Sequence, residues 1–139
     1  MKIIKVPEKE LNNLYETHFF FGKSYRGKDI VLGVNHPPIE PERALYILNA
    51  KFGKWNGYID NYKVTFEYIF KTDIYDNIYF TIYDYKGCMS CGMGIPKDLE
   101  VTKEGAEKIN KTLAALLREI YQDVRIYDYE FGIKGWRRW

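Results

Sequence analysis

Residues 78–95 read IYFTIYDYKGCMSCGMGI, and this stretch decides which fold class the chain can adopt. Its first half alternates aliphatic or aromatic residues with tyrosine and threonine, which is the two-residue period of a strand with one buried face. Lys86 and Gly87 then form a tight link to a second strand at about 88–95, which Pro96 ends. The stretch therefore predicts two neighbouring strands of an antiparallel sheet.

Patterns of the same kind extend this sheet. Residues 62–70 alternate apolar and polar side chains, and a last strand is expected at residues 124–131. Shorter strands are expected at 2–6 and 29–34. Because consecutive strands are grouped in the middle of the chain, the sheet is expected to be mainly antiparallel.

Three segments carry the apolar spacing of amphipathic helices. They are the segment from Pro7 to Gly22, residues 41–52 and residues 102–122. His18 falls on the apolar stripe of the first helix, where a neutral core histidine is the common outcome. Together with the strands, these helices predict an α+β fold, a mainly antiparallel sheet with about three helices packed on one face.

The composition is that of one globular domain. The 139 residues are 46% hydrophobic and 29% charged, and no proline-rich or glycine-serine tract divides them. We expect a single α+β domain over residues 1–139, with residues 132–139 as an aromatic and basic tail docked on it. The N-terminal residues lack the apolar run of a signal peptide, and no stretch is apolar enough to cross a bilayer. A cytoplasmic protein without membrane contact is expected.

Cys88 and Cys91 have the spacing of a redox or metal motif, but their context argues against both. A redox pair begins a helix, whereas Gly92, Gly94 and Pro96 follow here. Residues three apart in a strand point to opposite faces, and zinc would need two further ligands. We interpret the pair as part of a strand or hairpin, with a metal site and a redox site as alternatives. We expect no catalytic residue, no metal and no cofactor.

Tyrosine is unusually frequent, with 13 residues in this chain. If the aliphatic positions of the strands meet the helices, the alternating tyrosines project from the other face. Such a face is either solvated and stabilised by cross-strand tyrosine pairs or used for binding, since tyrosine is frequent among interface hot spots. The predicted partner-binding surface comprises Tyr79, Tyr83, Tyr85, Tyr127 and Tyr129 with Asp84 and Asp128.

Charge indicates the kind of partner. The predicted sheet is mildly acidic, although the whole chain has a formal net charge of +2. An aromatic face that stacks RNA bases would need flanking positive charge, so nucleic acid is not expected there. We expect a basic protein as partner and, by analogy of fold and surface, a stoichiometric inhibitor of the immunity or antitoxin kind. A two-fold homodimer through the same face is the alternative.

Two other functions remain open on the sequence alone. A small-molecule or nucleotide binder, with or without catalysis, would use a pocket near the loop 35–42 with His36, Glu40 and Arg43. A nucleic-acid binder would use basic and aromatic residues from two parts of the chain. These residues are Trp136, Arg137, Arg138 and Trp139 with Lys23, Arg26 and Lys28.

Overall fold

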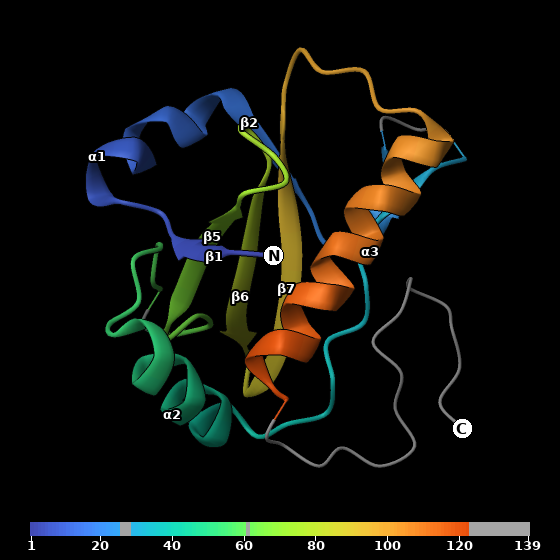
Figure 1. Cartoon of the computed structure of the whole chain (residues 1–139). Helices are drawn as coiled ribbons and strands as arrows, with labels where there is room; N and C mark the ends of the chain where they lie inside the picture. The colour runs from blue at the N-terminus through green and yellow to red at the C-terminus, as the bar shows by residue number, and fades with distance from the viewer. Residues whose placement is uncertain (26–28, 61, 123–139) are drawn as a thin grey trace.

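The computed structural model describes residues 1–25, 29–60 and 62–122 (Figure 1). Several expectations from the sequence lie outside the described residues. They concern the strand at 124–131 with Tyr127, Asp128 and Tyr129, the tail 132–139, and the basic residues Arg26 and Lys28.

The fold is α+β, as the sequence predicts. The main strands are β1 (Ile3–Lys5), β2 (Thr17–Phe20), β5 (Glu67–Thr72), β6 (Tyr79–Tyr85) and β7 (Cys88–Pro96). The other elements are α1 (Glu8–Leu11), the 3-10 helix η1 (Asn12–Glu16), β3 (Lys23–Ser24), β4 (Val31–Leu32), α2 (Pro41–Phe52) and α3 (Lys103–Ile120). The main sheet is antiparallel with the order β1-β5-β6-β7-β2, and β3 pairs with β4 separately.

The β6–β7 hairpin confirms the prediction of two strands joined by a tight link. Tyr85 pairs with Cys88 across the turn, and Lys86 and Gly87 have φ angles of 50° and 82°. Two successive residues in the left-handed region are typical of a type I′ turn, whose twist matches that of the paired strands. Both cysteines therefore belong to a strand, with Cys88 exposed and Cys91 buried.

α2 and α3 cover one face of the main sheet (Figure 1). Their apolar stripes pack against side chains that point the same way from three adjacent strands, which removes a large apolar area from water. Buried members of this core include Leu48 on α2, Leu113 on α3, Phe70 on β5, Ile82 on β6 and Met93 on β7. Thr102 caps the N-terminus of α3, because its hydroxyl accepts a hydrogen bond from the backbone N–H of Gly105 at 3.0 Å.

The opposite face is covered at one end by α1 and η1. Leu11 and Leu14 pack there against Val6, Ile69 and Tyr79, which form a second and smaller cluster. The two long helices thus share one face, whereas the short α1 lies on the other. We call the side that α2 and α3 leave uncovered the open face.

The predicted first helix is wrong beyond η1. Residues 17–20 form the edge strand β2, in which His18 pairs with Ile95 and Phe20 with Met93 of β7. A threonine and two adjacent phenylalanines favour a strand, and pairing with the edge of β7 outweighs the helical spacing. His18 is consequently exposed and is not a core histidine.

The strand expected at 62–70 begins later, at Glu67. The backbone N–H groups of Thr65 and Phe66 donate to the Asp84 carboxylate at 2.8 and 3.0 Å, and the Thr65 hydroxyl donates to the same carboxylate. These donors are bound to a side chain instead of to a neighbouring strand, so regular pairing starts after them.

The other predicted elements that lie within the described residues are present. The strands expected at 2–6 and 29–34 are observed in shorter form as β1 and β4, and the helices at 41–52 and 102–122 are α2 and α3. Within the part of the chain that the structure describes, no helix combines the length and apolar character needed to cross a bilayer.

Candidate functional site

Three tyrosines of the predicted surface project from the open face, but to different depths. Tyr79, Tyr83 and Tyr85 alternate along β6. Tyr79 is 8% exposed because it packs with Leu11 and Leu14 in the second cluster. Tyr83 is half-buried, and Tyr85 is 43% exposed. The expectation that Tyr79 is accessible is therefore wrong, whereas Tyr83 and Tyr85 can be reached by a partner.

Asp84 does not belong to the open face. The two-residue alternation of β6 places it on the side of Phe80 and Ile82, under the long helices. It is 5% exposed, and its carboxylate accepts the three hydrogen bonds from Thr65 and Phe66. Its predicted place on the partner-binding surface is corrected accordingly, since it holds the chain at the entry to β5.

Two phenylalanine rings lie over β7 because that strand has glycine beneath them. A Cβ at Gly92 would overlap the ring of Phe21, and a Cβ at Gly94 would meet the ring of Phe19 at 2.9 Å. The two rings stack with their centroids 6.3 Å apart, and Phe21 meets Tyr83 edge to face at 5.4 Å. The glycines of the CGMG stretch therefore permit close packing of aromatic rings on the open face.

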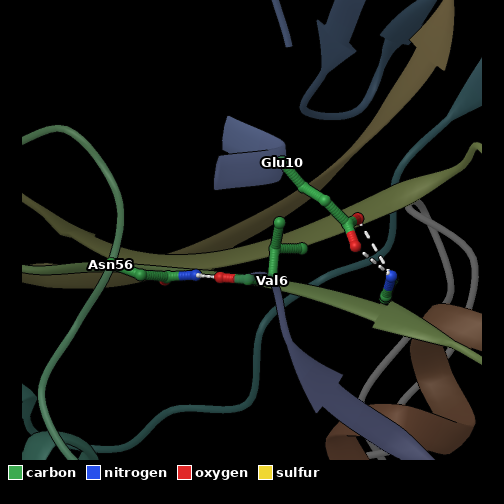
Figure 2. Close-up of polar contacts among 4 residues, drawn as sticks. Val6, Glu10 and Asn56 are labelled. Carbon is green, nitrogen blue, oxygen red and sulfur yellow. Dashed lines mark hydrogen bonds and ion pairs between the residues drawn. The ribbon is translucent and has the colours of Figure 1, made fainter. Parts of the chain in front are cut away.

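Asn56 holds its loop against β5 on the open face. Asn56 Nδ2 donates to the backbone oxygen of Val6 at 3.0 Å (Figure 2). The same Nδ2 donates to the backbone oxygen of Ile69 at 3.0 Å, and Oδ1 accepts from the N–H of Ile69 at 2.8 Å. The carboxamide thus pairs with the backbone of β5 as a neighbouring strand would. Nearby, Lys71 Nζ contacts Glu10 Oε1 at 2.7 Å and ties α1 to β5 (Figure 2).

The residues after Asn56 fold over Glu67. The N–H of Gly57 donates to the Glu67 backbone oxygen, and the N–H of Tyr58 donates to Oε1, both at 2.9 Å. A side chain at position 57 would overlap that of Glu67, so glycine is required there. From β6, the Thr81 hydroxyl donates to Oε2 at 3.2 Å. Burial raises the pKa of the Glu67 carboxyl above its ordinary value.

These walls line an apolar pocket of about 420 Å³ on the open face, which we call the open-face pocket. Glu67 lies within it, and Phe21 and Tyr58, which are 36% and 77% exposed, lie at its border with solvent. A mostly apolar cavity of this size with one convergent polar group is typical of a binding site. Its lining residues are Leu11, Leu14, Phe19, Phe21, Asn56, Gly57, Tyr58, Glu67 and Ile69.

None of the nine residues that line the pocket belongs to the surface predicted from the sequence, and Glu67, Phe21 and Tyr58 are the most important of those missed. The alternation in residues 62–70 places Glu67 opposite to Tyr68, and this signal is sufficient to assign it to the tyrosine side of the sheet. Phe21 reaches the pocket because it follows β2, and Tyr58 reaches it because the contacts of Asn56 hold the loop in place. No local pattern indicates either of them.

His36 makes contacts within the fold. Its Nδ1 donates to the backbone oxygen of Pro37 at 2.7 Å, which leaves Nε2 to accept from the hydroxyl of Tyr121 at 2.9 Å. The two rings meet edge to face, and burial lowers the pKa of His36 to about 4. Glu40 and Arg43, the other residues of the pocket expected around His36, are exposed.

Cys88 and Cys91 are both free thiols, and the buried thiol of Cys91 donates to the backbone oxygen of Val34 at 3.5 Å. Among the described residues, no three histidine, cysteine, aspartate or glutamate side chains are grouped so as to hold a metal ion. The glycines that follow Cys91 serve the aromatic packing described above.

Comparison with protein families, curated proteins and solved structures finds no match for this chain. The function must therefore be argued from the site itself.

We expect Gly92→Ala to lower the free energy of unfolding by about 1–3 kcal/mol, because the new methyl group would overlap both the Phe21 ring and the backbone oxygen of Phe20. Urea denaturation measures this cost. In the Phe21→Ala background the same substitution should cost less, and the difference isolates the ring contact. Equal costs in the two backgrounds would show that the Phe21 ring contributes nothing to the cost and that the contact with the Phe20 backbone oxygen accounts for it.

Stability should fall as pH falls from about 6.5 toward 4. In the unfolded chain His36 becomes protonated near pH 6.5, whereas in the folded protein it stays neutral down to about pH 4. The unfolded state therefore binds more protons between these pH values. The loss attributable to His36 is up to about 3 kcal/mol. Urea denaturation at pH 7 and pH 4.5 measures it.

The matched variants are His36→Gln, which removes the titrating group, and His18→Gln, which changes an exposed histidine. His36→Gln should lose less stability than the wild type between these pH values, and His18→Gln should behave like the wild type. The same loss in His36→Gln as in the wild type would exclude His36 as its source.

Proposed function

We propose that this chain is a protein-binding domain that engages its partner through the open face. The binding surface comprises Phe21, Tyr58, Tyr83 and Tyr85, which we call the aromatic patch, together with Glu67. The observation that carries the proposal is the gathering of Phe21, Tyr58 and Tyr83, from separate parts of the chain, around one half-buried carboxylate, with Tyr85 next on the same face of β6. The patch lies on the side of the sheet that the long helices leave uncovered.

Pre-organisation supports this role. The Phe21 ring is held over Gly92 and against Tyr83, and the backbone from which the Tyr58 ring projects is held by its bond to Glu67. Aromatic side chains bury a large area with few rotatable bonds, and anchors already fixed in the free protein lose little entropy on binding. The patch therefore has the composition and the rigidity of an interface hot spot.

The proposed partner is a basic protein, because Glu67 supplies a negative charge within the aromatic surroundings. The aromatic patch and Glu67 together provide large aromatic side chains and one carboxylate, which suit protein recognition. On this proposal the chain acts in the cytoplasm as a stoichiometric inhibitor of the immunity or antitoxin kind. The analogy with such inhibitors is one of fold class and surface.

Replacing both Tyr83 and Tyr85 with alanine should weaken partner binding by about 2–4 kcal/mol, or roughly 30- to 700-fold. The intact protein serves as bait for a pull-down from the source cells, native mass spectrometry gives the stoichiometry, and calorimetry with the captured partner gives the affinity. Thermal unfolding of the double variant checks that the fold is retained.

Tyr46→Ala is the matched control, because Tyr46 is an exposed tyrosine on α2, on the other side of the sheet. It should bind as the wild type does. Unchanged affinity of the Tyr83→Ala/Tyr85→Ala variant would show that the partner uses another surface. Recovery of the bait alone, or only as a homodimer, would reject a foreign protein partner.

A further inference from the structure

Glu67 differs from the neighbouring acidic residues in how its charge is satisfied. Asp84 receives three hydrogen bonds from within the chain, and Glu10 is paired with Lys71. Glu67 receives one backbone and one hydroxyl donor, and no lysine or arginine of the described residues pairs with it. Each of its carboxylate oxygens retains acceptor capacity.

The surroundings make this arrangement costly in the free protein. The Glu67 carboxylate lies in a pocket whose other walls are mainly leucine, isoleucine and aromatic side chains, with Asn56 and Gly57 at one side. A charge in such surroundings is unfavourable unless a counter-charge accompanies it, and burial raises the pKa of this carboxyl accordingly. A cation that entered the pocket would remove the penalty.

We propose that the open-face pocket receives one arginine or lysine side chain of the protein partner, with its cationic head on Glu67. This inference rests on the proposed function and names the chemistry of the contact. The aliphatic stem of such a side chain would lie along Leu11 and Leu14, and its head would lie near the rings of Phe21 and Tyr58. The pocket volume of about 420 Å³ provides room for one such side chain.

Charge and geometry favour this occupant over others. A purely apolar side chain would leave the Glu67 carboxylate buried and unpaired, and a phosphate or carboxylate would be repelled by it. Arginine suits the site best, because its planar guanidinium donates two parallel hydrogen bonds and the two carboxylate oxygens each have capacity left.

The experiment titrates the full chain with three probes and follows backbone amide shifts by NMR. The first probe is the capped peptide Gly-Gly-Arg-Gly-Gly, the second replaces its arginine with norleucine, and the third is agmatine, a free guanidinium amine. We expect the arginine peptide to shift the amides of Tyr58, Glu67 and Thr81, with at least about ten-fold higher affinity than the norleucine peptide.

Glu67→Gln keeps the size of the side chain and removes its charge, and it should abolish this preference. Glu107→Gln, an exposed position on α3, is the matched control and should leave the preference intact. The comparison of the two peptides on the wild-type protein stands even if Glu67→Gln fails to fold.

Several results would overturn the proposal. These are equal affinity for the two peptides, no shifts at the pocket, a preference that survives Glu67→Gln, or binding of agmatine with exclusion of the arginine peptide. Concentration-dependent shifts of the same amides without any probe would instead assign the pocket to a second copy of the chain. A partner that is captured equally well by Glu67→Gln would refute this inference and leave the proposed function intact. Capture of no partner would refute the proposed function and, with it, the partner's side chain as the occupant, and the peptide titration would then establish only the affinity of the pocket for a guanidinium group.

Discussion

The two faces of the antiparallel sheet impose the constraint on which the other features depend. Along β6 the aliphatic positions point toward α2 and α3, so the tyrosine positions between them must point the other way. The two long helices both pack on one face of the sheet, and the short α1 with η1 covers one end of the other face. Apolar side chains on the remainder of the open face must therefore pack against one another or against a partner.

The shape of the site on the open face depends on three glycines and one asparagine. Because Gly92 and Gly94 have no side chain, the rings of Phe21 and Phe19 pack directly on β7. Gly57 likewise allows the loop after Asn56 to pack against Glu67. Asn56 supplies the hydrogen bonds that a further strand would have made to β5. Together these residues turn a flat sheet surface into a pocket with fixed walls.

Much of the fold follows from local pattern, and much of the site does not. The alternation in residues 78–95 and the turn at Lys86 and Gly87 are sufficient to predict the hairpin, because strand period and turn chemistry are local properties. The segment 17–20 was misassigned because its spacing fits a helix equally well, and pairing with the edge of β7 decides the outcome.

The candidate site shows the same division. Alternation places Tyr83 and Tyr85 on the open face and, applied strictly, removes Asp84 from it. The burial of Tyr79 depends on the path of α1 and η1 across the sheet, which is a long-range property that no short pattern specifies. The enclosure of Glu67 likewise depends on Asn56, which is 11 positions away along the chain.

The most direct test of the account is NMR cross-saturation from the captured partner to the backbone amides of this chain. The account predicts that signals are attenuated at residues 19–21, 56–58 and 83–86, which belong to the open face and its turn. Attenuation confined to the outer surfaces of α2 and α3 would contradict it, because the partner would then bind the side of the molecule that carries no aromatic patch.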